Sequence, residues 1–227
     1  MILEGDTQWI KRPGQFVNIE LEGLYLRRPI SICDWDDKTI TIIYKVVGKG
    51  TEQMSQMQPG VELDVLTGLG NGFNPEPAVE NTKSLLVGGG VGVPPLYHLA
   101  KVLLAVGRKV SVVLGFNTAA EVFYADEFRA LGADVYVSTA DGSMGVKGFV
   151  TDAIREAAID FDYFYSCGPL PMLKALCGCT DKPGELSFEE RMGCGFGACM
   201  GCSCKTLTGN KRICKEGPVM RREEIIW

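Results

Sequence analysis

The pattern of hydrophobic and polar positions changes near residue 84, and this change divides the chain into two differently built parts. Before it, β-branched residues and alternating apolar positions predict strands at residues 15–19, 39–47 and 60–65. Only residues 51–57 suggest a helix in this part. Residues 1–78 are therefore predicted to form a β-rich unit.

After residue 84, short apolar segments alternate with longer segments of helical periodicity. The pattern predicts helices near residues 96–106, 120–131 and 148–157, between strands at 85–87, 109–114, 134–138 and 161–165. Strands this apolar are buried on both faces, as in a parallel sheet covered by helices. An α/β domain is therefore predicted for residues 82–180.

The C-terminal residues 185–227 are expected to form a third, small lobe. The run Ser187-Phe188-Glu189-Glu190 matches a capping box, which predicts a short helix at the start of this lobe. Further on, residues 205–207 and 211–213 flank the turn residues Thr208-Gly209-Asn210, which predicts a hairpin.

Two glycine-containing turns follow strands of the predicted parallel sheet. Gly88-Gly89-Gly90-Val91-Gly92 comes after one strand and Cys167-Gly168-Pro169 after another, and each precedes a helix. Glycine lets backbone N–H groups approach a phosphate at a helix start. Either turn alone could be purely structural, but two turns at one sheet edge favour a dinucleotide-binding crevice.

Four cysteines near the C-terminus carry the most specific signal. Cys194, Cys199 and Cys202 have the Cys-x4-Cys-x2-Cys spacing of plant-type [2Fe–2S] proteins, and Cys214 follows further on. Structural zinc usually takes two close cysteine pairs, and a disulfide framework needs an oxidising compartment, so both alternatives fit less well. The hairpin would bring Cys214 towards both Cys202 and Cys204, and geometry alone does not decide between these two as ligand.

Composition argues against several classes of function. The chain has 227 residues, a net charge of −5 and no cluster of Lys or Arg, which argues against nucleic-acid binding. It has neither an 18-residue apolar span for a membrane helix nor a signal peptide. Nine cysteines in this context predict reduced thiols or metal ligands in the cytoplasm. The single histidine, His98, argues against a Ser-His-Asp triad or a multi-histidine metal site.

A basic segment in the β-rich part, Arg27-Arg28-Pro29-Ile30-Ser31-Ile32, has two interpretations. An Arg fixed by the following proline can bind a pyrophosphate in a bidentate manner, and the Ser31 hydroxyl can hydrogen-bond a flavin. The segment could equally be an exposed basic corner. Gly48-Lys49-Gly50-Thr51 could likewise present N–H groups to a phosphate or form only a turn.

Together these segments resemble one family along nearly the whole chain: the electron-transfer subunits of type B dihydroorotate dehydrogenase, in the ferredoxin–NADP reductase superfamily. The matching segments are Arg28-Pro29-Ile30-Ser31, Ile43-Tyr44-Lys45, Gly50-Thr51, Gly70-Asn71-Gly72-Phe73, Gly88-Gly89-Gly90-Val91-Gly92, Cys167-Gly168-Pro169, Glu189-Glu190-Arg191-Met192-Gly193-Cys194-Gly195 and Cys214-Lys215-Glu216-Gly217-Pro218-Val219. One departure concerns the start, because only twelve residues precede Pro13, where family members usually carry a further strand. Either the barrel lacks that strand and has an unpaired edge, or the natural start lies upstream of Met1.

The resemblance implies an N-terminal antiparallel β-barrel that binds FAD, a central α/β parallel-sheet domain that binds NAD, and a small C-terminal [2Fe–2S] lobe. It implies Cys194, Cys199, Cys202 and Cys214 as the cluster ligands, with Cys204 as a nearby spare. The residues implied to contact FAD are Arg28, Pro29, Ile30, Ser31, Ile43, Tyr44, Lys45, Gly50 and Thr51. Those predicted to bind NAD are Gly88, Gly89, Gly90, Gly92, Cys167, Gly168 and Pro169. No side chain is expected to act as a catalytic acid or base.

The implied activity is electron transfer in pyrimidine biosynthesis. An FMN-containing catalytic partner subunit, expected in a heterotetramer with two copies of each chain, would oxidise dihydroorotate, and electrons would pass through the cluster and FAD to NAD+. NAD is favoured over NADP also because residues 115–121 carry no Lys or Arg for a 2′-phosphate. The alternatives are a flavin/iron–sulfur subunit of a ferredoxin:NADP transhydrogenase or sulfide dehydrogenase-like complex and, in a different class, a zinc-stabilised interaction module.

Overall fold

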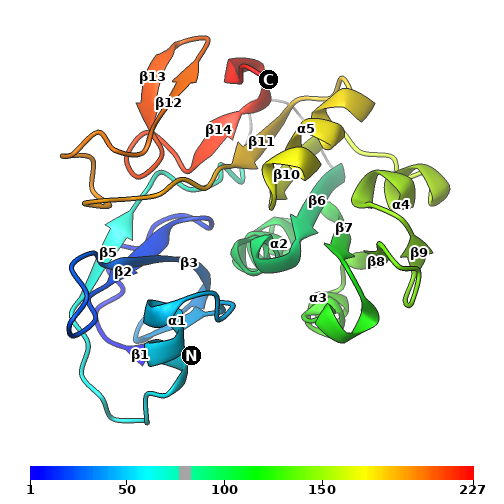
Figure 1. Ribbon diagram of the computed structural model, residues 1–227. Coiled ribbons are helices and arrows are strands. Elements are labelled where there is room, and N and C mark those ends of the chain that lie inside the picture. Colours follow the sequence, from blue (N-terminus) through cyan, green and yellow to red (C-terminus); the bar gives the residue numbers. More distant parts are fainter. Residues whose placement is uncertain (77–82) are drawn as a thin grey trace.

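The computed structural model describes residues 1–76 and 83–227. Figure 1 shows an N-terminal antiparallel sheet on one side, a larger sheet flanked by helices on the other, and the C-terminal segment extending over both. In the described ranges, no helix is long and apolar enough to cross a membrane. The predicted domain limits at residues 78 and 82 lie outside the described residues.

The N-terminal sheet has five antiparallel strands in the order β1-β4-β3-β2-β5 and forms a half-barrel. Its strands are β1 (Ile2–Glu4), β2 (Phe16–Ile19), β3 (Arg28–Trp35), β4 (Thr39–Ile42) and β5 (Val65–Leu69), and one helix, α1 (Lys49–Ser55), accompanies them. Inward-facing residues of β2, β3 and β4 share one apolar core with Met54 of α1. Burial of this shared core holds α1 beside the sheet.

Two details of this unit differ from the sequence-based expectation. Residues 2–4 form a short strand, β1, which pairs with β4 through Ile2 and Thr41, although no strand was predicted before Pro13. The strand expected at residues 60–65 begins only at Val65, because Val65 is where the chain first pairs with Ile19 of β2.

The larger sheet has seven strands in the order β14-β11-β10-β6-β7-β8-β9, all parallel to their neighbours except β14. They are β6 (Lys83–Gly89), β7 (Lys109–Phe116), β8 (Asp134–Thr139), β9 (Val146–Lys147), β10 (Tyr163–Cys167), β11 (Gly184–Ser187) and β14 (Val219–Arg221). The helices are α2 (Tyr97–Ala105), α3 (Ala125–Ala130), α4 (Val150–Glu156) and α5 (Leu170–Cys179), with single turns η1 (Gly90–Gly92), η2 (Pro94–Leu96), η3 (Ala119–Glu121) and η4 (Arg222–Glu224). Neighbouring β6 residues such as Leu85 and Leu86 belong to two separate apolar clusters, as expected for a sheet covered on both faces.

The C-terminal segment leaves this sheet after β11 and returns to it as β14. Between them lies a hairpin, β12 (Ser203–Thr206) and β13 (Gly209–Arg212), in the place where a hairpin was predicted. The helix predicted from Ser187 is wrong, because Ser187 is the last residue of β11 and pairs with Cys167. The helix predicted over 120–131 is interrupted, since Tyr124 has a φ of 64° and α3 begins after it.

Candidate functional site

A cavity of about 310 Å³ lies between the half-barrel and the larger sheet, and it collects the residues predicted to contact FAD. Four of them belong to β3, and three follow directly after β4. Its lining includes Arg28, Pro29, Ile30, Ser31, Ile43, Tyr44, Lys45 and Thr51. Burial raises the pKa of the Tyr44 phenol, which is therefore neutral and available for hydrogen bonding.

Gly50 is the one predicted flavin contact that does not line this cavity, but it packs against Arg28, which does. A Cβ at Gly50 would lie 2.1 Å from Nε of Arg28, so a larger residue would force that guanidinium to move. The neighbouring Thr51 hydroxyl is used locally, because it accepts the backbone N–H of Val47 at 2.9 Å and that of Gly48 at 3.2 Å. Thr51 thus caps the start of α1 beside the cavity.

The opposite wall of the cavity comes from the sheet edge and the C-terminal segment. Cys167, at the end of β10, lines it together with Ser187, Phe188 and Glu189. Burial raises the pKa of the Cys167 thiol to about 12, so this group remains protonated. The sequence pattern indicated Cys167, but not Phe188 or Glu189, because the residues after Ser187 were assigned to a helix.

The two glycine turns lie against each other at the carboxyl ends of β6 and β10. A Cβ at Gly92 would lie 2.2 Å from the carbonyl oxygen of Cys167, and one at Gly168 would lie 3.0 Å from the backbone nitrogen of Gly89. Gly88 is equally close-packed, with a hypothetical Cβ 2.9 Å from Val93. The turns therefore require glycine for their mutual approach.

A second cavity, of about 390 Å³, opens beside these turns. Gly89, Gly90 and Pro169 line it, whereas Gly88, Gly92 and Gly168 do not. Its other walls come from the ends of β7 and β8 and from the start of α4. A crevice beyond the carboxyl ends of parallel strands is where dinucleotides bind in sheets of this type.

The four predicted cluster ligands form two pairs of neighbouring sulfurs. Sγ of Cys202 lies 3.3 Å from Sγ of Cys214, and both residues are buried. Cys194 and Cys199 form the second pair, in which each backbone N–H points to the other's sulfur, at 3.4 and 3.5 Å. Two thiolates for each of two irons is the donor set of a [2Fe–2S] cluster. Over the described ranges, no three His, Cys, Asp or Glu side chains converge as a single-ion site would require.

Backbone N–H groups around the cysteines favour the thiolate form of one of them. Burial alone would raise the pKa of Cys194, but N–H donors from Cys199, Phe196 and Ala198 outweigh it and lower the pKa to about 6. In the buried pair, burial and the contact with Cys202 raise the pKa of Cys214 to about 12. The Cys194 thiolate is thus favoured at neutral pH, whereas Cys214 would lose its proton on metal binding.

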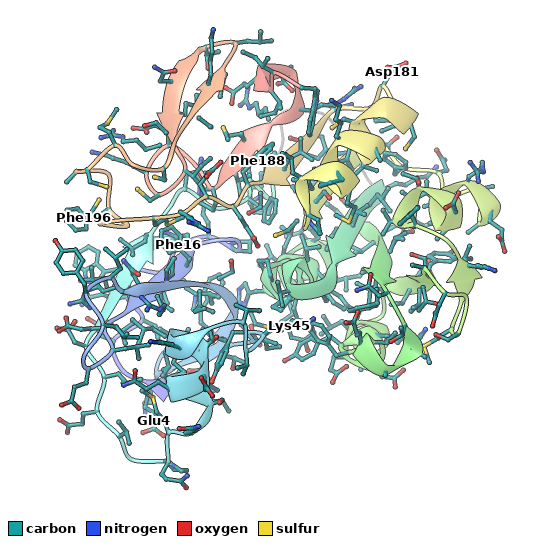
Figure 2. The ribbon with its side chains drawn as sticks, viewed as in Figure 1. Glu4, Phe16, Lys45, Asp181, Phe188 and Phe196 are labelled. Carbon is teal, nitrogen blue, oxygen red and sulfur yellow. The ribbon has the colours of Figure 1, made fainter. Side chains whose placement is uncertain are left out.

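Phe16 connects the cysteine loop to the 310 Å³ cavity, which we call the flavin cavity after the residues predicted to contact FAD. It lines the cavity and also belongs to the apolar cluster that contains Cys202 and Cys214. Figure 2 shows Phe16 where β2 meets the C-terminal segment, with Phe196 at the outer margin of that segment. Asn18, also on β2, donates its side-chain amide to the carbonyl of Cys194 at 3.2 Å. No local sequence pattern indicates either contact, since both join residues far apart in the chain.

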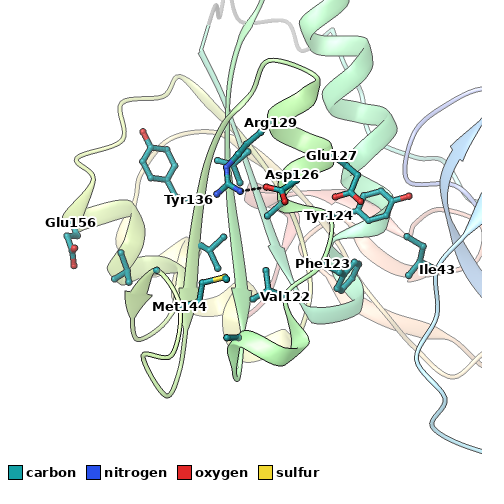
Figure 3. Close-up of a pocket in the computed structure, with 16 residues that line it drawn as sticks. Ile43, Val122, Phe123, Tyr124, Asp126, Glu127, Arg129, Tyr136, Met144 and Glu156 are labelled. Atoms are coloured by element: carbon teal, nitrogen blue, oxygen red, sulfur yellow. Dashed lines mark hydrogen bonds and ion pairs between the residues drawn. The ribbon is translucent and has the colours of Figure 1, made fainter.

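A larger cavity, of about 1050 Å³, lies beside α3 and β8 (Figure 3). Ile43 is the one predicted site residue in its lining, which is otherwise mainly apolar, with carboxylates such as Asp126 and Glu156 among its residues. Asp126 is paired with Arg129 at 2.7 Å. Cavity size alone therefore does not pick out the predicted site residues, most of which lie at the two smaller cavities and at the cysteine loop.

Comparison with known proteins agrees with this geometry. Residues 189–226 match the family model for the iron–sulfur cluster binding domain of dihydroorotate dehydrogenase B, and residues 86–178 match that for the oxidoreductase NAD-binding domain. The chain is 50% identical to the electron transfer subunit of dihydroorotate dehydrogenase B (NAD(+)) from Geobacillus kaustophilus, covering 97% of this chain and 89% of the relative. It is 47% identical to that of Fusobacterium nucleatum, covering 95% and 87%.

Solved structures show the same fold. An NADH-dependent reduced ferredoxin-NADP oxidoreductase, described in work on flavin-based electron bifurcation, matches with a TM-score of 0.85 and 35% identity over 96% of this chain and 80% of that chain. A cytochrome P450 reductase from Amycolatopsis shares the fold at a TM-score of 0.64 and 23% identity, covering 74% of this chain and 56% of that chain. With its close curated relatives, its matching domains and its paired cysteines, the chain belongs to the family of electron transfer subunits of NAD(+)-dependent dihydroorotate dehydrogenase B.

Proposed function

We propose that this chain carries electrons from dihydroorotate, oxidised on an FMN-containing catalytic subunit, to NAD+ in pyrimidine biosynthesis. The observation that carries the proposal is the continuity of the three sites. The flavin cavity shares Cys167 with the turn that supports the nucleotide crevice, and it shares Phe16 with the apolar cluster around Cys202 and Cys214. Three adjoining sites in a row are expected of a protein that transfers electrons between cofactors rather than of one that binds a single ligand.

Each group has a proposed set of binding residues. Arg28 and the following Pro29-Ile30-Ser31 would hold FAD, together with Ile43-Tyr44-Lys45 and the Gly50-Thr51 turn. Cys194 with Cys199, and Cys202 with Cys214, would each hold one iron of the cluster. When bound, a flavin accepts electrons singly or in pairs, which joins one-electron cluster chemistry to two-electron nicotinamide chemistry.

The protein's own contribution is orientation and exclusion of water. Gly88, Gly89, Gly90, Gly92, Gly168 and Pro169 would bring backbone close to the dinucleotide phosphates at the sheet edge. Cys167, kept as a neutral thiol by burial, would line the flavin cavity without adding charge. The apolar Phe16, Phe188 and Met192 would keep solvent from the region between the flavin cavity and the cysteines.

The remaining elements of the proposal concern assembly. We infer one catalytic partner subunit per chain, with two copies of each in a heterotetramer, and NAD(H) as the dinucleotide. The cytoplasm is the proposed location, because none of the nine cysteines, all of which lie in the described ranges, is in a disulfide. A division into residues 1–78, 82–180 and 185–227 describes the three binding units, although β11 and β14 of the last unit also belong to the seven-stranded sheet.

An anaerobic titration tests the proposal. The purified chain, with its flavin and iron quantified, is mixed with NADH, and the flavin and cluster absorption bands are followed. Both should bleach, and dihydroorotate should bleach them only after the catalytic subunit is added. A chain that NADH reduces but that dihydroorotate plus the catalytic subunit leaves oxidised would favour the transhydrogenase-type alternative. A colourless protein containing zinc would refute both.

A further inference from the structure

One face of β2 reaches both pairs of cysteines. Residues two apart on a strand share a face, so Phe16 and Asn18 point to the same side of the sheet. Phe16 packs in the apolar cluster that contains Cys202 and Cys214. Nδ2 of Asn18 donates to the carbonyl oxygen of Cys194 at 3.2 Å. A single strand of the half-barrel therefore contacts both halves of the proposed cluster site, where β2 meets the C-terminal segment (Figure 2).

The hydrogen bonding of Asn18 is incomplete although its side chain is buried. The residue is 1% exposed, and Oδ1 has no hydrogen-bond partner among the described residues. Nδ2 carries two N–H groups, and the bond to Cys194 uses one of them. A buried acceptor without a donor lowers the stability of a protein, and an apolar side chain of the same size would avoid this cost. The amide at this position therefore calls for an explanation other than the stability of the half-barrel.

The surroundings of this amide fix its orientation. The opposite orientation would place Oδ1 against the carbonyl oxygen of Cys194, and two acceptors in contact repel each other. The N–H end, which is the positive end of the amide dipole, consequently faces residues 194–195. A Cβ at Gly195 would lie 2.3 Å from Nδ2, so the chain passes directly over the amide at this point. Gly195 has a φ of 79°, which glycine adopts without strain.

The backbone of Asn18 belongs to the sheet that carries the flavin cavity. Asn18 pairs with Pro29 of β3, and Pro29 lines that cavity. Nη1 of Arg27 lies 3.5 Å from the carbonyl oxygen of Asn18 and 2.8 Å from Oδ1 of Asp64, which holds this part of the sheet together. One residue thus connects a strand of the flavin cavity to a proposed iron ligand, Cys194, with no loop between them.

We propose that Asn18 is a positioning residue for the iron–sulfur cluster. It holds the Cys194-Gly195 turn in place against the flavin-binding sheet, and its amide raises the reduction potential of the cluster. The inference rests on the proposed function, in particular on Cys194 as an iron ligand. It adds a residue of the half-barrel that controls where the cluster lies and how readily the cluster accepts an electron.

The physical reason is the charge that the cluster site gains on reduction. An added electron brings one negative charge, and N–H dipoles directed at that charge stabilise the reduced form. The effect of a dipole is larger in a buried place, where the local dielectric constant is low. Leucine has a volume similar to that of asparagine, so it would keep the packing at position 18 while removing both the dipole and the bond to Cys194.

The test uses the full chain loaded with flavin and cluster, as wild type, Asn18→Leu, Asn18→Ala and Ser84→Ala. Electron paramagnetic resonance of the reduced cluster reports the surroundings of the irons, and a redox titration gives the midpoint potential. The rate at which a chelator removes iron measures how firmly the cluster is held. Ser84→Ala is the matched control, because Ser84 on β6 is also 1% exposed and has an unpaired side-chain oxygen, but it belongs to the other sheet.

Both Asn18 variants should have a reduction equilibrium about tenfold less favourable, which makes the midpoint potential about 59 mV more negative for a one-electron couple. Their resonance spectra should differ from that of the wild type, because the Cys194 turn is no longer tied to β2. The chelator should remove iron roughly tenfold faster. Ser84→Ala should match the wild type in all three measurements. If leucine crowds Gly195 and prevents loading, Asn18→Ala supplies the measurement, since alanine adds no atom at that contact.

The possible failures are distinguishable. A wild-type potential and spectrum in Asn18→Ala would overturn the inference and leave the proposed function in place. A change of equal size in Ser84→Ala, or a more positive potential in the Asn18 variants, would also overturn it. If the wild-type chain binds flavin but forms no cluster, the proposed function fails together with this inference.

Discussion

Nδ1 of His98 on α2 lies 2.6 Å from Oδ1 of Asp34 on β3, so the chain's single histidine joins the half-barrel to the nucleotide-binding sheet. Nζ of Lys101, one turn further along α2, lies 2.8 Å from both oxygens of the same carboxylate. Trp35 stacks on the His98 ring with centroids 3.5 Å apart. These contacts fix the orientation of the half-barrel relative to the seven-stranded sheet, and with it the position of the flavin cavity between them.

Asp34→Asn should therefore weaken the protein by about 1–3 kcal/mol in the free energy of unfolding at neutral pH, because it removes a charged acceptor from two donors. Burial opposes ionisation of Asp34, but the hydrogen bonds from His98 and Lys101 outweigh it and lower its pKa. The stabilisation is thus present above the ordinary aspartate pKa and is lost as the pH falls through the lowered value. Urea unfolding at several pH values measures it.

Asp126→Asn is the matched control, since Asp126 pairs with Arg129 on the surface and its side chain is 94% exposed. Exposed pairs of this kind contribute about 0–1 kcal/mol. Equal losses in the two variants would mean that the contact between β3 and α2 contributes nothing beyond a surface ion pair.

Gly50→Ala should reduce flavin binding, because the new Cβ would lie 2.1 Å from Nε of Arg28 and would displace that side chain from the flavin cavity. We expect roughly a tenfold or greater weakening of FAD, measured by equilibrium dialysis of the reconstituted protein. Gly48→Ala is the control, because Gly48 has extended backbone and no atom lies within 4 Å of its hypothetical Cβ. Similar FAD affinity in both variants would remove Arg28 from the binding site.

Replacement of single cysteines by serine should separate the four proposed ligands from their neighbour. Cys194→Ser, Cys199→Ser, Cys202→Ser and Cys214→Ser should each lower the iron and acid-labile sulfide content and the visible cluster absorption. Cys204→Ser should retain them, because the sulfur contact of Cys214 is with Cys202. Retention of the cluster in Cys202→Ser, with loss in Cys204→Ser, would reverse this assignment.

Glu185 on β11 should make the protein less stable as the pH rises through the neutral range. Its side chain is buried, it accepts the Asn74 backbone N–H at 2.8 Å, and burial raises its pKa from 4.5 to about 7. The protonated carboxyl therefore supports the fold fully below its ordinary pKa, and that support is lost as the pH rises through the folded-state value.

Glu185→Gln should consequently flatten the pH dependence and should be more stable than the wild type at mildly alkaline pH. Denaturant unfolding on both sides of neutrality provides the measurement. The exposed Glu62→Gln serves as control and should leave the wild-type slope unchanged. A Glu185→Gln protein with the full wild-type slope would show that another group carries the titration.

The parts of the fold that depend on local pattern were predictable from sequence. The apolar strands and the glycine turns appear at the predicted sheet edge, because strand burial and φ-dependent turns are encoded within a few residues. Ser187 shows the limit. Its capping pattern favours a helix, but pairing with Cys167 on β10 places it in a strand. Tertiary pairing overrides such local preferences.

The candidate site divides in the same way. Arg28, the glycine turns and the cysteine spacing carry recognisable patterns, whereas Phe16 and Phe188 do not. The residues of this second group become part of a site only when distant segments meet, as when β2 packs against the cysteine loop. Sequence periodicity reports which face of an element is apolar, but it does not report which other element covers that face.

The chain leaves the seven-stranded sheet after β11 and rejoins it as β14, and this has a consequence for protein that has lost its iron. Because β11 and β14 are adjacent strands of the seven-stranded sheet, the cysteine-bearing segment between them, residues 188–218, is attached to that sheet at both ends. Oxidative loss of iron would therefore make residues 188–218 less ordered while the seven-stranded sheet stays folded. We therefore expect the iron-depleted chain to remain folded and to act as a diaphorase, in which NADH still reduces the flavin. Electron transfer between the flavin and a catalytic subunit should be lost, because the cluster that would carry the electrons is absent.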